Sequence, residues 1–128
     1  MLKTTLTLAL LGTGILAASC GGGGIDERAV RKLMDEKLCL TCHTLNGKMV
    51  LNTGAEATGP TLKGIFGKKE TVLVNGEEQE ITIDEAYLRE SITNPSVKIT
   101  KGFKDEMKPG EMTAEEVDQI VQYLMTLK

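Results

Sequence analysis

The chain has no tryptophan, two phenylalanines and two tyrosines, so only 3% of its 128 residues are aromatic. A core built from so few large flat side chains is thin. The single histidine and three cysteines exclude a metal site made of several histidines, and the odd cysteine count argues against a simple disulfide framework. The formal net charge of −3 does not favour nucleic acid as a partner. The length fits one folded domain.

The single histidine ends the most informative motif in the chain, Cys39-Leu40-Thr41-Cys42-His43. This pattern is C-x-x-C-H, which is typical of the attachment site of a c-type haem. Two thiols one helical turn apart can each add to one vinyl group of a porphyrin, and the adjacent imidazole can bind the iron from one side. A buried porphyrin would also supply the large flat apolar body that the side chains lack.

A C-x-x-C pair without further context also occurs in redox dithiols and in zinc sites. A dithiol has no need of His43, and a zinc site needs more ligands, although Cys20 is the only other thiol in the chain. We therefore expect one covalently bound haem c, attached at Cys39 and Cys42, with His43 as an axial ligand of the iron. Dithiol and zinc chemistry remain the alternatives.

The first nineteen residues are expected to be a signal peptide. A positively charged start at Met1–Lys3 precedes an apolar run, Leu6–Leu16, which is too short to span a bilayer comfortably. An uncleaved membrane anchor is the alternative. The end of this stretch, Ala18-Ser19-Cys20, resembles a bacterial lipobox, in which the cysteine is acylated. One departure is Ala17, because lipoboxes usually have leucine three residues before the cysteine.

The expected domain organisation follows from this signal. Residues 1–19 form the lipoprotein signal peptide, residues 20–24 form the lipidated cysteine with a tether of four glycines, and residues 25–128 form the folded domain. The protein is then expected to be exported and held by its lipid in the bacterial cell envelope, on the periplasmic side of a membrane. Export agrees with the haem motif, because c-type haem is attached outside the cytoplasm.

The residues around the motif predict how it is held. Asp26 is expected to cap a helix that runs toward Leu40 and delivers Cys39 and Cys42 on successive turns. Pro60 is expected at the first position of a short helix, with its carbonyl accepting a hydrogen bond from His43, which makes Pro60 a candidate cofactor-binding residue. A simple turn at Gly59-Pro60 is the alternative.

The second half of the chain predicts a hairpin and two helices. Asn75-Gly76 joins two β-prone runs, 71–74 and 77–83, which predicts a β-hairpin that we expect to be surface decoration. Thr82 with Glu85 predicts a capping box for a helix that ends at Asn94-Pro95. Thr113 with Glu116 predicts another for the last helix. The apolar side of that helix is formed by Val117, Ile120, Val121, Leu124 and Leu127.

Residues 25–128 resemble a class I cytochrome c, and most of all the cytochrome c domain fused to subunit II of some bacterial haem–copper oxidases. The resemblance rests on the haem motif, Gly59-Pro60-x-Leu62-x-Gly64, the hairpin, residues 84–92, Asn94-Pro95 and Gly102-Phe103. It implies a mainly α fold with crossing N- and C-terminal helices and a small β-hairpin insertion. The oxidase subunit carries a copper domain and membrane helices, whereas this chain has a lipobox and four glycines.

The resemblance also implies a methionine as the second axial ligand of the iron, on the loop before the last helix. Two methionines stand there, Met107 and Met112. Met112 is expected to pack on Val117 as a hydrophobic staple, whereas Met107 has no structural role in a polar loop, so Met107 is the preferred ligand. The family often has proline directly after the methionine, but here Lys108 intervenes.

With both axial positions filled, the expected function is electron transfer rather than catalysis. The protein would carry electrons between redox proteins of a respiratory chain, and the resemblance implies a haem–copper oxidase as acceptor. One alternative is a haem-based sensor or peroxidase-like enzyme with a labile sixth ligand, and another is a fixed subunit of a membrane oxidoreductase. Partner docking is expected to use seven lysines near the haem, with the acids elsewhere: Lys63, Lys68, Lys69, Lys98, Lys101, Lys104 and Lys108.

Overall fold

The computed structural model describes residues 24–108 and 110–128. The predicted signal peptide and Cys20 lie outside the described residues. Within the described part, no helix combines the length and the apolar character needed to cross a membrane. The elements in chain order are α1 (Glu27–Glu36), the 3₁₀ turn η1 (Cys39–Thr41), β1 (Lys69–Val74), β2 (Glu77–Thr82), α2 (Glu85–Thr93), the 3₁₀ turn η2 (Pro95–Val97), β3 (Ile99–Thr100) and α3 (Ala114–Thr126).

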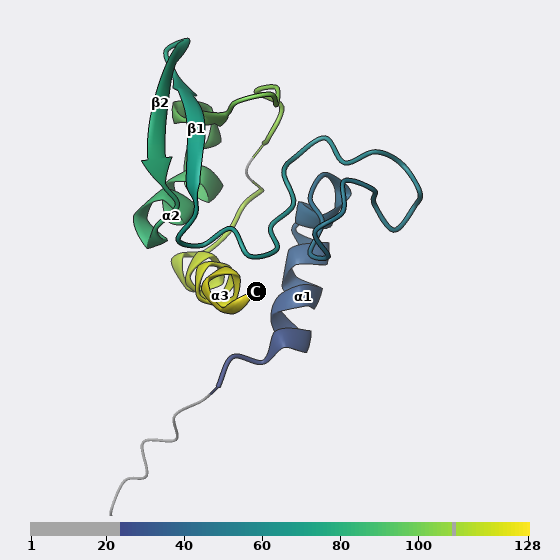
Figure 1. Cartoon of the computed structure of the whole chain (residues 1–128). Helices are drawn as coiled ribbons and strands as arrows, with labels where there is room; N and C mark the ends of the chain where they lie inside the picture. The colour runs from purple at the N-terminus through teal and green to yellow at the C-terminus, as the bar shows by residue number, and fades with distance from the viewer. Residues whose placement is uncertain (1–23, 109) are drawn as a thin grey trace, which may run out of the picture.

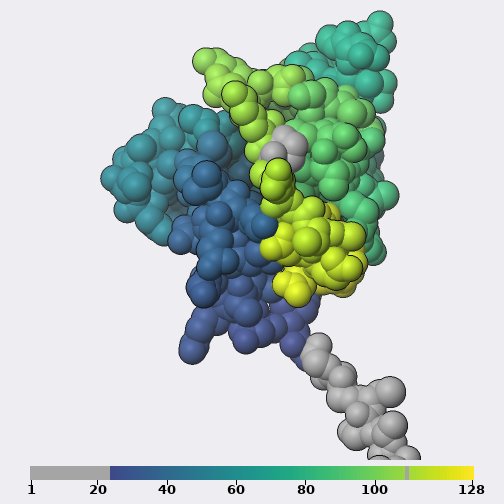
Figure 2. All heavy atoms as spheres, turned by 180° about the vertical axis from the view of Figure 1, so that it is seen from behind, coloured from purple at the N-terminus to yellow at the C-terminus, as the bar shows by residue number. Residues whose placement is uncertain are grey.

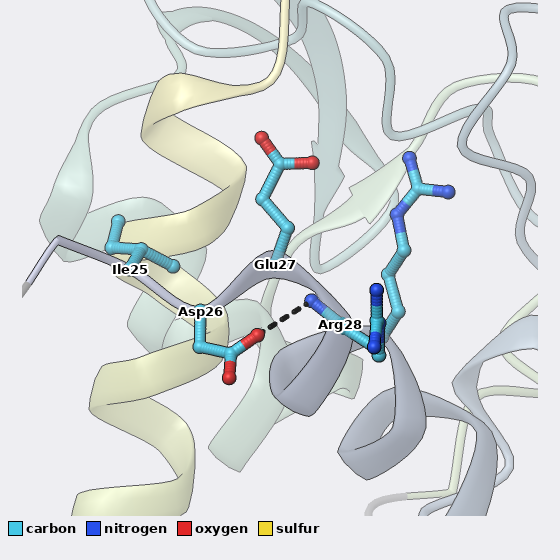
Figure 3. A pocket seen from close by; sticks show the side chains of 5 residues that line it. Ile25, Asp26, Glu27 and Arg28 are labelled. Atoms are coloured by element: carbon cyan, nitrogen blue, oxygen red, sulfur yellow. Dashed lines mark hydrogen bonds between the residues drawn. The ribbon is translucent and has the colours of Figure 1, made fainter.

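Helix α1 begins where the sequence predicts and ends earlier. The Asp26 carboxylate accepts hydrogen bonds from the backbone N–H groups of Arg28 and Ala29, and Figure 3 shows the first of these. The helix ends at Glu36 because Leu38 adopts a left-handed conformation with φ 61°, which α-helical backbone cannot accommodate. The expectation that α1 carries both cysteines on successive turns is therefore wrong. Leu38 leaves the apolar stripe and is 67% exposed.

The core lies where α1 and α3 meet. The two helices contact one another, and in Figure 1 they cross, with α3 seen nearly end-on and α1 from the side. Figure 2 shows the same contact from behind, with yellow α3 against purple-blue α1. Val30 and Met34 of α1 are buried in one cluster with the apolar side of α3. The arrangement agrees with crossing terminal helices, and burial of these side chains stabilises it through the hydrophobic effect.

A hydrogen bond at the same crossing joins the two helices. Tyr123 of α3 is fully buried, and its hydroxyl accepts a hydrogen bond of 2.8 Å from Nε of Arg31 on α1. The Arg31 guanidinium carbon also lies 6.0 Å from the centre of the Tyr123 ring. Tyr123 is therefore a packing residue whose hydroxyl has a partner, as a buried tyrosine requires.

The hairpin forms at the expected turn, but it is more than decoration. Asn75 and Gly76 both have positive φ, 52° and 85°, as a type I′ turn requires. A third strand, β3, which the sequence patterns did not predict, pairs with the other side of β1 and gives the order β2-β1-β3. Central Val72 is fully buried. The outer strand β2 is an edge with three exposed glutamates, Glu77, Glu78 and Glu80.

Helix α2 joins the sheet to α3. Its N-cap is Asp84, whose carboxylate accepts from the Tyr87 N–H, so the expected capping box of Thr82 and Glu85 is wrong. Leu88 and Ile92 are buried in the common core, and the helix ends at Asn94 as expected. At α3 the capping box of Thr113 and Glu116 is present, with each side chain bonded to the other residue's backbone N–H.

We predict that Tyr123→Phe lowers the free energy of unfolding by about 1 kcal/mol, because Arg31 loses an acceptor inside the helix crossing. The measurement is chemical denaturation of the haem-loaded protein. Tyr87→Phe is the matched control, because its hydroxyl lies 3.5 Å from Oγ1 of Thr100, at the limit of a hydrogen bond. Equal losses in the two variants would contradict a specific role for the bond between Arg31 and Tyr123.

Candidate functional site

The centre of the site is a pairing of two short backbone segments, residues 42–44 and 59–62. The Gly59 N–H donates to the Cys42 carbonyl at 3.0 Å, and the Leu62 N–H donates to the Thr44 carbonyl at 2.8 Å. No helix begins at Pro60, so that expectation is wrong, and residues 59–67 form turns instead. This pairing places the Pro60 carbonyl beside His43, which follows Cys42.

His43 is held in one orientation by this pairing. Its Nδ1–H donates to the Pro60 carbonyl oxygen at 2.8 Å, which is the hydrogen bond expected from the sequence. Since Nδ1 carries the proton, Nε2 presents a lone pair. Burial lowers the pKa of His43, against a smaller opposing effect of the Pro60 hydrogen bond. Burial therefore favours the neutral imidazole, which is the form that binds a metal ion.

Gly59 is required by the closeness of the histidine ring. A Cβ atom at Gly59 would lie 2.5 Å from Cε1 of His43 and 2.8 Å from Nδ1, well inside van der Waals contact. A larger residue would push the ring away from the position that the Pro60 carbonyl sets. The sequence motif includes Gly59, but it did not predict that the His43 ring lies against this residue.

The two cysteines stand on the turn just before His43. The N–H groups of Cys42 and His43 both donate to the Cys39 carbonyl, at 3.4 and 3.0 Å, which winds the segment into a compact turn. Both thiols are free; Cys39 is half-buried and Cys42 is exposed. Burial raises the pKa of the Cys39 thiol, partly offset by a hydrogen bond from its own backbone. A catalytic dithiol needs a lowered thiol pKa, so this chemistry disfavours the dithiol alternative.

The zinc alternative also lacks support. Across residues 24–108 and 110–128, no group of three or more histidine, cysteine, aspartate and glutamate side chains is placed to hold a metal ion. A structural zinc site uses four such ligands. The available donors are one imidazole nitrogen and two thiols in sequence, which is the set that a c-type haem uses.

The surroundings of this donor set fit a haem. A pocket of about 200 Å³ opens beside His43, and several apolar side chains near the motif pack on the core with part of their surface uncovered. These partly covered side chains include Leu40, Leu45, Leu62 and Ile65. An oriented, neutral imidazole with a free Nε2, two adjacent free thiols and an incompletely covered apolar wall are what covalent haem attachment requires.

The two candidate methionines lie in different environments. Met107 is 38% exposed on the irregular loop between β3 and α3. Met112 is partly buried against the core that contains Val117, in agreement with the expected staple. In both whole-molecule views the light-green segment before α3 runs between the sheet with α2 and the blue-teal irregular segment that precedes β1 (Figures 1 and 2). Of the two, Met107 is the one without a packing role.

Four of the seven lysines that were expected near the haem are paired with glutamates, contrary to the expectation that the acids lie elsewhere. Lys101 lies 2.8 Å from Glu78, and Lys69 lies 2.6 Å from Glu80. Lys98 pairs with Glu90 and Lys104 with Glu106. Two hairpin glutamates, Glu78 and Glu80, are among these partners. The positive charge around the site is therefore smaller than the lysine count suggests.

One buried polar residue at the site had no signal in the sequence. Thr44 directly follows the histidine and is 6% exposed. Its hydroxyl donates to the Lys48 carbonyl, and its own carbonyl accepts from Leu62. Thr44 thus links residue 48 on one side and residue 62 on the other through hydrogen bonds, and so supports the loop after His43. No periodic or spacing pattern marks such a residue.

Comparison with known proteins agrees with this geometry. The family model described as cytochrome c matches residues 28–128. The chain is also similar to cytochrome c2 iso-1 of Magnetospirillum fulvum, with 28% identity over 96 residues that cover 70% of this chain and 91% of that protein. The family match includes the C-x-x-C-H motif and extends through α3.

We predict that Gly59→Ala displaces the His43 ring, because the new methyl group would overlap Cε1. The variant should show a reduced yield of haem-loaded protein and an altered absorption spectrum in the part that does load. Gly24→Ala is the matched control, because a Cβ atom there meets nothing within 4 Å. A Gly59→Ala protein with wild-type yield and spectrum would contradict the close approach.

Proposed function

The chain belongs to the cytochrome c family and carries one covalently bound haem c, and from this premise we propose that it is a single-haem electron carrier. The bound iron supplies a one-electron redox couple. The observation that carries the proposal is the orientation of His43, whose Nδ1 is bonded to Pro60 and whose Nε2 is free. A ligand locked in this way would fix one axial position of the iron, and a methionine in the other position would leave no site for a substrate.

The roles of the individual residues follow from the donor set. Cys39 and Cys42 would hold the porphyrin through thioether bonds, and His43 would bind the iron through Nε2. Pro60 keeps the imidazole in its tautomer and orientation. Met107 would bind the iron through its thioether sulfur as the second protein ligand. A thioether ligand and an apolar wall both favour the reduced state and raise the potential.

A haem whose sixth position opens to a small ligand is the second candidate function. It is favoured by one observation, the 38% exposure of Met107 on an irregular loop. In that reading Met107 would leave the iron readily, and the protein would be a sensor or a peroxidase-like enzyme. The electron-carrier proposal is preferred because Met107, which is not needed for core packing as Met112 is, would fill the sixth position and close it to a small ligand.

We further propose that the carrier is exported and anchored to a membrane by lipid on Cys20, with the four glycines as a flexible tether. The donor and acceptor would be redox proteins of a respiratory chain, with a haem–copper oxidase as acceptor, either as transient partners or within a fixed assembly. Because four of the seven lysines near the site are paired with glutamates, charge steering of these partners is expected to be modest.

We predict that Met107→Ala abolishes the weak long-wavelength charge-transfer band of the oxidised haem, lowers the reduction potential and lets carbon monoxide bind the reduced haem. These changes follow from the loss of the thioether ligand. The measurements are absorption spectroscopy with and without carbon monoxide and a redox titration.

Met112→Ala is the matched control for Met107→Ala. It should keep the band and lower the free energy of unfolding by about 1 kcal/mol, as for the loss of a helix-terminus interaction. The reverse pattern would assign the ligand to Met112. A wild-type protein without the band that binds carbon monoxide at once would instead favour the open-site function.

We predict that Cys20→Ser gives an exported, haem-loaded protein that is released in soluble form, because serine has no sulfur atom to form the thioether bond to the lipid. Cell fractionation and mass spectrometry of the mature N-terminus are the measurements. Ser19→Ala, which keeps a small residue before the cysteine, should remain anchored. Wild-type protein without acyl chains on its N-terminus would overturn the lipid anchor.

A further inference from the structure

The loop that carries Met107 is fastened on both sides of this residue. Before it, the Ser96 hydroxyl donates to the Asp105 carboxylate at 2.8 Å. After it, the Glu111 carbonyl accepts a hydrogen bond of 2.8 Å from Nζ of Lys37. The first contact joins residues only nine positions apart, whereas the second joins the loop to Lys37, 74 positions earlier in the chain.

Lys37 stands at the end of α1, as its C-cap residue, two residues before Cys39. Its own N–H is bonded to the Leu33 carbonyl at 2.9 Å, which fixes its backbone to α1. Its Nζ lies 2.8 Å from Oε2 of Glu116, and the two side chains are only 22% and 27% exposed. The ammonium group therefore makes two charge-assisted contacts in a partly covered site, where such contacts are stronger than on an open surface.

Glu116 is already committed to the start of α3. Its Oε2 accepts from the Thr113 N–H at 2.9 Å, as half of the capping box. The Lys37 ammonium group thus binds the end of the loop, through the Glu111 carbonyl, and the first turn of α3, through the Glu116 carboxylate. These contacts also lower the pKa of the Glu116 carboxyl, with the Lys37 contact as the larger cause.

We propose that Lys37 is a positioning residue for the sixth ligand: it ties the segment that holds Cys39 and the loop that holds Met107 into one unit, and so keeps the Met107 thioether bound. The inference rests on the proposed role of Met107. Without the tie, the loop would sample open positions more often, and an outside ligand would compete better for the iron. Lys98, Lys101 and Lys104, which precede Met107 in the chain, pair with glutamates of α2, the hairpin and their own loop.

The test is equilibrium binding of imidazole to the oxidised, haem-loaded protein, because imidazole must displace the sixth ligand. Lys37→Met keeps the length of the side chain and removes both contacts. We expect imidazole to bind roughly three- to tenfold more tightly, as for the net loss of one ordinary hydrogen bond. The charge-transfer band should also disappear at a lower temperature than in wild type, before global unfolding.

Three further variants separate positioning from stability. Lys32→Met removes an exposed ion pair with Glu36 on the same helix and should leave imidazole affinity unchanged. Glu116→Gln keeps an acceptor for the capping box but loses the charge, so its effect should be smaller than that of Lys37→Met. Lys37→Arg can still reach Glu116 and should restore most of the wild-type affinity.

The outcomes distinguish this inference from the proposed function. If Met107→Ala keeps the charge-transfer band, the ligand assignment fails. If Met107→Ala loses the band but Lys37→Met lowers only the free energy of unfolding, with unchanged imidazole affinity, the positioning role is overturned and Lys37 is a structural residue. An equal effect of Lys32→Met would also overturn it, because general loss of charge on α1 would then be the cause.

Discussion

The backbone pairing of residues 42–44 with residues 59–62 is the constraint on which the site depends. It brings the Pro60 carbonyl to Nδ1 of His43, and it leaves so little room that only glycine fits at position 59. The rest of the molecule serves to hold these two segments together. Helix α1 leads into the first segment, and the turns after the second lead into β1, so the pairing joins the two halves of the fold.

The helix crossing is the second constraint, and it ties the ends of the chain to the site. Val30 and Met34 of α1 pack in one cluster with Ile120, Val121 and Leu124 of α3. Arg31 and Lys37, on the polar side of the same segment, reach Tyr123 and Glu116. Four of the five named α3 residues are buried, so α1 cannot move without disturbing α3. The position of the haem-attachment turn is therefore set by residues about ninety positions away in sequence.

Local chemistry in the sequence predicted several parts of this structure. The hairpin turn follows from Asn75-Gly76, because both residues adopt positive φ readily, and the α3 capping box follows from residues that lie three apart. The parts that were wrong depend on contacts between distant segments or on choices between neighbours. Strand β3 has two residues and exists only through β1. Asp84 displaced Thr82 as the α2 cap, although both are good capping residues.

At the site, the hydrogen bond from His43 to Pro60 was predicted and is present, whereas the ligands of the haem and of the iron stay a prediction. The motif identifies the donor atoms, since spacing alone determines which thiols and which imidazole can share one haem. Three other features could not be predicted from the sequence, because each depends on how the chain is placed in space. They are the left-handed backbone of Leu38, the closeness of Gly59 to the His43 ring and the pairing of lysines with glutamates. The expectation that lysines and acids lie apart failed chiefly because the hairpin lies beside the segment after β3. Lys101 and Glu78 are therefore close in space although they are far apart in sequence.

The acidic outer edge of the sheet bears on how copies of this protein behave when crowded. An open β-edge offers unpaired backbone groups to any other strand, which is a common route to aggregation. Here Glu78 and Glu80 are held by Lys101 and Lys69 of the same molecule, and Glu77 is exposed beside them. A second copy approaching edge to edge would have to break these ion pairs and bring carboxylates together. The hairpin that completes the fold thereby also discourages the protein from polymerising through its own sheet.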